Sequence, residues 1–454
     1  MRRVQTGGCG GLGAIAVIRR PLVLGRAAHR CYRLLRDQRR PPEAVRALQS
    51  QRLRAIVRHA YERTEFYRER FDAAGITPAD IREPADLSGL PITGREDLRS
   101  PNSLIARGRA PDRLKRSVTS GSSGRQTTTY FDEDAWLVGK YLIKLRARLA
   151  CGVRPWDRIA LFQEEVLQEH RPPIGARIRA FSIHRPIEDV VSQAEAFNPQ
   201  VLYGFPGYLA RLAEIAHGRL APRLVFTSGE LLDEVTRRRI EAALGTRVLD
   251  VYGCTEVKEI AWQCPWSEAY HLNADWLVLE ALPGEPGTGR RGGTLLVTSL
   301  FNYAMPLLRY ALGDTGEILE QACPCGRGLP LVRPTLGRSV DYLVLADGAM
   351  IPPYALTCAI EHFQGMRQYQ IVQTALDRVE VRVVPLVDFD DSTRLGIQQS
   401  LRPVLHGLTA EVRVVDEIPP EASGKYRIVK SLVPEGGRAA GPQARRPGGP
   451  PSGR

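Results

Sequence analysis

Short apolar runs alternate with stretches of helical character between residues 117 and 252. The clearest runs cover residues 158–162, 201–203, 223–226 and 248–252. Apolar runs of this length separated by helical segments are typical of strands that lie side by side and are joined by crossover helices. The sequence therefore predicts an α/β fold for the central part of the chain.

Other elements flank this central part. Helical spacing of apolar residues over 43–75 predicts opening helices, and two apolar runs at 276–282 and 294–300 predict an antiparallel hairpin. Shorter strands and one helix after Gly337 predict a small α+β domain. We expect a large N-terminal domain of α/β subdomains over 41–336 and a small mobile C-terminal domain over 337–434. A disordered leader over 1–40 and a disordered tail over 435–454 complete the prediction.

Composition narrows the class of protein. The formal charge is +13, but only six of the 63 basic residues are lysine, and the arginines are spread along the chain. The sequence has no cluster of basic residues interleaved with aromatic residues, which would indicate a nucleic-acid partner. It also has no apolar run that approaches the ~20 residues needed to span a bilayer. Eight cysteines in 454 residues do not form a secreted disulfide scaffold, so a reducing cytoplasm is expected.

Four polar segments carry the candidate chemistry. Hydroxyls, glycines and Arg125 over 119–127 could face phosphate oxygens, although such a run alone is more often a flexible loop. Glu256 follows a strand, where a carboxylate can hold magnesium, and Asp314 lies in an expected turn. Lys425 lies in a loop over 421–427, where a lysine suits a reacting phosphate or carboxylate.

In this order the four segments resemble the adenylate-forming superfamily of acyl-CoA ligases, luciferases and peptide-synthetase adenylation domains. The chain is similar more narrowly to the phenylacetate–CoA ligase branch, including its capsule-biosynthesis and coenzyme F390 synthetase-like relatives. This narrower resemblance spans about residues 45–434 and rests on Leu90-Pro91-Ile92-Thr93, Thr227-Ser228-Gly229-Glu230 and Cys325-Gly326-Arg327, among others.

The resemblance implies a role for each matching residue. It implies that the loop grips the pyrophosphoryl end of ATP through Thr119, Ser120, Gly121, Ser122, Ser123, Gly124 and Arg125. Gly229, Glu230, Tyr252 and Gly253 are implied around the nucleotide, and Thr255 and Glu256 at the α-phosphate and magnesium. Asp314 is implied at the ribose, Arg338 after the domain junction, and Lys425 between the carboxylate and the α-phosphate. The acid is expected against Tyr203, Phe205, Pro206, Gly253 and Cys254.

Two positions depart from the family pattern. Arg125 stands where the family usually has lysine, which keeps the charge, and Val340 stands where an acidic residue is common.

A separate group of metal-ligand residues lies outside the four segments. Cys264 and His271 form a Cys-x₆-His pair, and Cys323 and Cys325 form a Cys-x-Cys pair about fifty residues later. Three thiolates and one imidazole can complete a tetrahedral structural zinc site, while the alternative is four ordinary reduced residues.

The expected activity is ATP- and Mg²⁺-dependent conversion of a carboxylic acid, with an aryl acid favoured, to an acyl-adenylate. Coenzyme A is the expected acceptor, and a carrier-protein thiol or an amine acting in trans is the alternative. A non-catalytic nucleotide-binding relative is the alternative from another class. We expect a monomer or homodimer without nucleic-acid or membrane partners.

Overall fold

The computed structural model describes residues 21–118, 127–163, 177–183, 185–229, 232, 234–282, 293–335, 343–345, 350–351, 356–357, 359–360, 363, 365–419 and 428–433. These residues separate into two compact units, with 21–335 in the first and 343–433 in the second. The predicted α/β fold with a small C-terminal α+β part is confirmed.

Helices open the first unit, and the spacing of apolar residues predicts the second and third of them. They are α1 (Pro21–Asp37), α2 (Pro42–Arg63) and α3 (Glu65–Ala74). The predicted apolar face of α2 is buried: Val45, Leu48, Leu53, Ile56, Val57 and Ala60. Thr64 caps α3 by accepting from the Tyr67 amide, and Gly75 ends it in the left-handed region at φ 64°.

Helix α1 lies within the stretch for which the sequence predicted a disordered leader. Leu34 is 1% exposed and packs with Phe131 and Ile143. The prediction is therefore corrected for residues 21–40, because an apolar position of α1 is buried against the rest of the unit. Residues 1–20 lie outside the described part of the chain.

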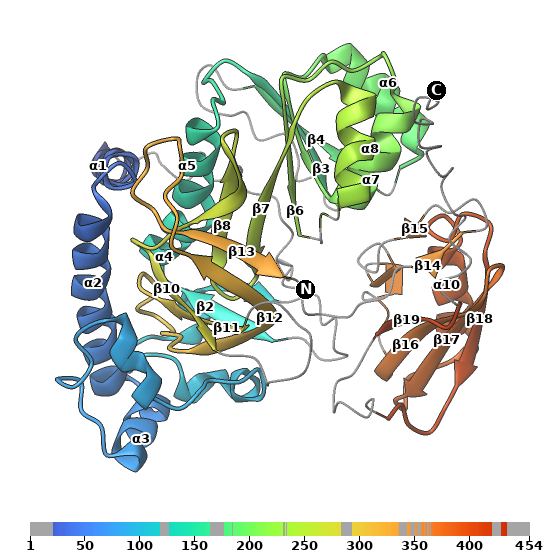
Figure 1. Cartoon of the computed structure of the whole chain (residues 1–454). Helices are drawn as coiled ribbons and strands as arrows, with labels where there is room; N and C mark the ends of the chain where they lie inside the picture. The colour runs from blue at the N-terminus through green and yellow to red at the C-terminus, as the bar shows by residue number, and fades with distance from the viewer. Residues whose placement is uncertain are drawn as a thin grey trace, which may run out of the picture. The chain divides into compact units, whose positions relative to one another are not determined.

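A sheet of eleven strands dominates the first unit, and half of it is parallel (Figure 1). The parallel strands run in the order β4-β3-β5-β6-β7. Their bounds are β3 (Arg158–Gln163), β4 (Arg177–Ser182), β5 (Val201–Gly204), β6 (Leu224–Ser228) and β7 (Val248–Cys254). The four predicted central strands correspond to β3, β5, β6 and β7.

Alternate residues of these strands enter two different cores. Ile159 and Leu161 of β3 join one apolar cluster, whereas Ala160 and Phe162 join another. The second cluster lies under α6 (Ile187–Phe197), α7 (Pro206–Ile215) and α8 (Glu234–Leu244), which Figure 1 shows grouped beside the parallel strands. Both faces are therefore covered, which accounts for the nearly continuous apolar runs in the sequence.

The other half of the sheet is antiparallel and continues from β7 in the order β8-β9-β13-β12-β11-β10. Its strands are β8 (Lys258–Cys264), β9 (Ser267–Leu272), β10 (Leu277–Leu282), β11 (Gly293–Ser299), β12 (Tyr310–Leu319) and β13 (Leu331–Thr335). Strands β10 and β11 pair antiparallel from Leu277↔Ser299 to Leu282↔Thr294. This confirms the predicted hairpin and places it at one edge of the sheet.

A two-stranded sheet flanks the predicted phosphate loop. It consists of β1 (Lys115–Val118) and β2 (Thr128–Phe131), paired antiparallel from Lys115↔Phe131 to Val118↔Thr128. The chain continues through α4 (Glu133–Leu137), one π-helical turn and α5 (Ile143–Ala150), which contacts β8.

The second unit contains a four-stranded sheet in the order β18-β17-β16-β19 and a separate two-stranded sheet, β14-β15, and helix α10 contacts β18. Its elements are β14 (Leu343–Val344), β15 (Met350–Ile351), β16 (Met366–Ala375), β17 (Arg378–Pro385), α10 (Asp391–Leu401), β18 (Thr409–Val414) and β19 (Val429–Ser431). Ile371, Val381 and Ile397 are fully buried in its core. Across both units, no described helix has the length and apolar character needed to cross a bilayer.

Candidate active site

The candidate nucleotide and acid residues of the first unit follow the carboxyl ends of neighbouring parallel strands. Phe205 follows β5, Gly229 follows β6, and Thr255 follows β7. The register Gly204↔Thr227 and Ser228↔Val251 brings these ends to one edge of the sheet. Ligands of open α/β sheets bind at this edge, so the fold gathers residues that lie far apart in the sequence.

Glu256 is buried at this edge and held by a tyrosine of the antiparallel half. The hydroxyl of Tyr310 donates to Glu256 Oε1 at 2.9 Å. Burial and the neighbouring carboxylate raise the pKa of Tyr310, so the phenol keeps its proton and remains a donor. The carboxylate thus has a fixed orientation and can offer a hard oxygen ligand to Mg²⁺.

Asp314 is tied to the same edge by a second tyrosine–carboxylate pair. The hydroxyl of Tyr252 in β7 donates to Asp314 Oδ2 at 2.9 Å. Asp314 does not lie in the expected turn but within β12, where the register on β11 shifts between Thr294 and Leu296. Gly313 has φ 80° there. This bulge directs the carboxylate toward β7.

The two tyrosine–carboxylate hydrogen bonds, Tyr310–Glu256 and Tyr252–Asp314, show that the sheet is curved. Three strands separate β7 from β12, so a flat sheet would hold them about 19 Å apart. Two side-chain hydrogen bonds nevertheless join the β7 end to β12. The sheet must therefore curl, and the curl brings Glu256 and Asp314 to one site.

Two glycines at the site are required by geometry. Gly229 has φ 91°, a conformation that other residues rarely adopt. A Cβ on Gly253 would lie 2.5 Å from the backbone oxygen of Lys258, because β8 folds back closely on β7. Both positions also expose backbone to a ligand, which fits their predicted place around a nucleotide.

Lys258 is a site residue that the sequence analysis missed. Its ammonium group donates to Thr255 O at 2.9 Å and to Ser117 Oγ at the end of β1. It also lies 4.6 Å from the ring centre of Phe131. Desolvation, followed by the charges of Lys144 and Lys140, lowers its pKa to about 7. The available signal was its position two residues after Glu256 in a chain with six lysines.

Cys254 lies beside Glu256 but lacks the properties of a nucleophile. Burial, followed by the charge of Glu256, raises the pKa of its thiol well above the usual value. A reactive cysteine needs a lowered pKa. Cys254 is therefore suited to line the site as a small neutral side chain.

The expected acid-binding residues lie at the carboxyl ends of β5 and β7: Tyr203, Phe205 and Pro206 at β5, and Gly253 and Cys254 at β7. Tyr203 and Phe205 are buried, Pro206 begins α7, and Arg148 stacks 4.9 Å above the Tyr203 ring. A cavity of about 10 Å³ lies against Gln163, Tyr203, Phe205 and Ser228, among others. This volume is about that of one water, so an acid of any size requires these side chains to move.

A larger hollow of about 480 Å³ lies elsewhere, between the end of α8 and the start of β7. Its lining is Arg237, Glu241, Gly245, Thr246, Arg247 and Glu268. It is polar and lies at the amino ends of the parallel strands, away from the ligand edge. Arg247 and Glu268 form an ion pair across it, so we assign it no part in the chemistry.

Several predicted site residues lie outside the described part of the chain. They are the loop residues Thr119, Ser120, Gly121, Ser122, Ser123, Gly124 and Arg125, together with Glu230, Arg338 and Lys425. Their roles remain predictions.

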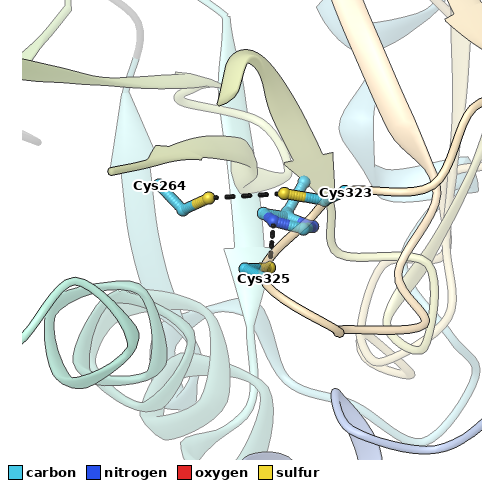
Figure 2. Close-up of side chains that lie close together, drawn as sticks. Cys264, Cys323 and Cys325 are labelled. Carbon is cyan, nitrogen blue, oxygen red and sulfur yellow. Dashed lines mark hydrogen bonds between the residues drawn. The ribbon is translucent and has the colours of Figure 1, made fainter. Parts of the chain in front are cut away.

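The predicted metal-ligand residues come together in the first unit. One ligand atom from each of Cys264, His271, Cys323 and Cys325 lies within 4.8 Å of all the others. Figure 2 shows the three sulfurs facing one another, although the cysteines come from two distant segments.

The fold is similar to that of a solved acyl-CoA ligase. A 2-hydroxyisobutyryl-CoA ligase solved with 2-HIB-AMP and CoA matches it at TM-score 0.61 and 21% identity, over 87% of this chain and 91% of that one. The same enzyme in its postadenylation state matches at TM-score 0.56 and 22% identity, with the same coverage.

Relatives by sequence narrow this class. The phenylacetate–CoA ligase of Thermus thermophilus is 29% identical over 76% of this chain and 82% of its own length, and that of Escherichia coli is 28% identical over 75% and 82%. Protein CapK of Staphylococcus aureus is 22% identical over 84% and 88%, and residues 343–432 match the CapK C-terminal domain. The chain is thus similar to the phenylacetate–CoA ligases over about three quarters of its length, and its C-terminal part matches the CapK C-terminal domain, in line with its motifs.

Proposed function

We propose that the chain is an adenylate-forming ligase that activates a carboxylic acid with ATP and transfers the acyl group to coenzyme A. A carboxylate oxygen attacks the α-phosphorus, the bond to the bridging oxygen breaks, and pyrophosphate leaves. The thiol sulfur of coenzyme A then attacks the acyl carbon and loses its proton, and AMP leaves. An aryl acid is favoured, as in the relatives named for phenylacetate.

The observation that supports this function best is the pair of tyrosine-held carboxylates at the ligand edge. In the proposal, Asp314, which Tyr252 orients, accepts hydrogen bonds from the ribose hydroxyls, and Glu256, which Tyr310 orients, meets the α-phosphate and magnesium together with Thr255. Glu256 would hold Mg²⁺, and that ion would supply positive charge next to the triphosphate. Because both carboxylates are already oriented, little reorganisation accompanies nucleotide binding.

Lys425 supplies the remaining charge in the proposed reaction. Its ammonium group contacts the carboxylate and the α-phosphate together, where negative charge develops during transfer. The loop over 119–125 holds the pyrophosphate that leaves, with Arg125 in place of the usual lysine. These roles rest on the resemblance of the segments to the family.

The proposed sequence of steps needs a rotation at residues 336–338, between domains proposed at 41–336 and 337–434. Rotation removes Lys425 after adenylation and opens the site to coenzyme A. A Gly337→Pro variant should adenylate at the wild-type rate but transfer slowly. Equal slowing of both half-reactions would contradict the rotation.

Transfer to an amine or a carrier-protein thiol is a second candidate. One observation favours it: a relative that is 26% identical over 36% of this chain and 43% of its own length is named for joining fumarate to (S)-2,3-diaminopropanoate. Adenylation is common to both candidates, so only the acceptor distinguishes them.

ATP–pyrophosphate exchange across a panel of aryl and aliphatic acids tests the proposal. We expect exchange with one class of acid, and a loss of about 100-fold or more in Lys425→Ala. Lys430→Ala, a second lysine of the same unit, is the matched control. ATP binding without exchange for any acid would contradict catalysis and favour a non-catalytic nucleotide-binding protein.

The acceptor is tested separately. The adenylate formed in the exchange reaction is offered coenzyme A, a carrier-protein thiol and simple amines. Rapid AMP release with coenzyme A alone supports the proposed transfer, whereas release only with an amine or carrier supports the second candidate.

A further inference from the structure

The cluster of Cys264, His271, Cys323 and Cys325 lies at the other end of β8 from the active site. Lys258 begins this strand beside Thr255, and Cys264 ends it. Seven residues of extended chain span about 20 Å, so the cluster cannot reach the reacting atoms. Its chemistry, if it binds a ligand, is independent of acid activation.

The donor atoms have the spacing of a tetrahedral metal site. The sulfurs of Cys264 and Cys323 lie 3.6 Å apart, and the sulfur of Cys325 lies 3.2 Å from His271 Nε2. A disulfide would need about 2.05 Å. Zn–S bonds of about 2.3 Å give a tetrahedron whose edges are about 3.8 Å, close to the observed sulfur separation.

The fold encloses the four donor side chains. Cys264, His271 and Cys323 are almost wholly buried, and Cys325 is partly buried. Backbone N–H groups of Trp266, Cys325 and Arg327 donate to the sulfurs of Cys264, Cys323 and Cys325, respectively. Each sulfur therefore has an amide donor, an arrangement that stabilises thiolate ligands from the outer shell.

We propose that these four residues hold one structural Zn²⁺ ion, which fastens the loop before β13 to the β8–β9 hairpin. Four protein ligands fill the tetrahedron and leave no open position for catalysis. Binding releases the thiol protons to solvent.

The fastened loop is a junction between distant segments. Arg327 donates to the Gln38 side chain at 3.1 Å and to Ala150 O at 3.2 Å, and the Gly328 amide donates to Gln38 O at 3.2 Å. A Cβ on Gly328 would clash with Arg40 O, which shows how closely the loop approaches the start of the helical region. The ion therefore helps to join the opening helices, α5 and the sheet.

The experiment measures metal content in the full chain purified without added metal. We expect about one zinc per chain, reduced at least tenfold in Cys264→Ser and in Cys323→Ser. Cys151→Ser is the matched control, because Cys151 is buried nearby but donates to the Gln263 carbonyl. It should keep its zinc.

Two further readouts keep the test decisive if a variant fails to fold. Replacement of zinc by Co²⁺ in the wild-type chain should give the visible absorption of tetrahedral thiolate ligation. Chelation should lower the midpoint of thermal unfolding, and added zinc should restore it. A folded wild-type chain without metal, a Cys264–Cys323 disulfide, or equal zinc loss in Cys151→Ser would overturn the proposal.

Discussion

The two ends of strand β8 hold polar clusters of opposite character. At the Lys258 end, carboxylates receive hydrogen bonds from tyrosines and face the edge where a nucleotide is expected. At the Cys264 end, three sulfurs and an imidazole face one another. We propose that the first cluster binds the nucleotide reversibly and that the second encloses a structural zinc ion.

The contrast between the two ends of β8 suggests which residues mainly determine stability and which mainly determine activity. Gln263, next to Cys264, accepts from the Asp250 amide and from Arg237, so the thiol end supports the middle of β7. At the site end, Tyr252 belongs to β7 and Glu256 to the turn that follows β7. We expect changes at the thiol end to reduce stability first and changes at the site end to reduce rate first.

Glu256→Gln should have the largest effect on rate. The substitution keeps the size of the side chain and an acceptor for Tyr310 but removes the charge that Mg²⁺ needs. We expect ATP–pyrophosphate exchange to fall by about 100-fold or more, with little change in the thermal midpoint. A large loss of stability together with zinc release would contradict the idea that the Lys258 end affects mainly rate and the Cys264 end mainly stability.

Asp314→Asn should have the next largest effect. An amide keeps the hydrogen bond from Tyr252 but binds ribose hydroxyls more weakly than a carboxylate. We expect the KM for ATP to rise about tenfold while kcat changes less, since a charged hydrogen bond contributes about 1.5–3 kcal/mol. Steady-state exchange at varied ATP measures this. A loss confined to kcat would place Asp314 in the chemistry instead.

Tyr310→Phe should have a smaller effect, because it leaves Glu256 charged and removes only one hydrogen bond. We expect a decrease in exchange of about fivefold, equivalent to about 1 kcal/mol. Tyr252→Phe is the matched variant at the other pair and should instead raise the KM for ATP. Identical kinetic changes in both would contradict distinct roles for the two carboxylates.

Much of this arrangement could be predicted from the sequence. Strands buried on both faces give apolar runs, so four of the parallel strands could be predicted from the sequence. The β10–β11 hairpin could be predicted as well. The spacing of Cys264, His271, Cys323 and Cys325 indicated their convergence. Helix α1 was not predicted, because the glycines and arginines near the start of the chain interrupt its short apolar pattern.

The curl of the sheet could not be predicted. No local pattern shows that β12 returns to β7, so the Tyr310–Glu256 bond was not foreseen although both residues lie in recognised motifs. The bulge that carries Asp314 looked like a turn because Gly313 and Asp314 are common in turns. Lys258 has no local signal of burial, because its partners Ser117 and Phe131 lie more than 120 residues earlier.

Lys258→Met tests the site end through the pH dependence of stability and not through the rate. The pKa of Lys258 is about 7 in the fold, and an unfolded lysine titrates near 10.4. Between about pH 7 and 10 the unfolded chain therefore binds a proton that the folded chain lacks. The contribution of Lys258 to the free energy of unfolding should rise with pH, by at most about 1.4 kcal/mol per unit.

Urea unfolding of the wild type and of Lys258→Met across pH 7–10 measures this contribution as a difference. The wild type should gain stability relative to the variant as the pH rises, and Lys115→Met, at an exposed lysine, corrects for the change in net charge. Parallel curves would mean that Lys258 stays charged in the fold. It would then act as a permanent cation beside Thr255, and its loss should weaken ATP binding at every pH.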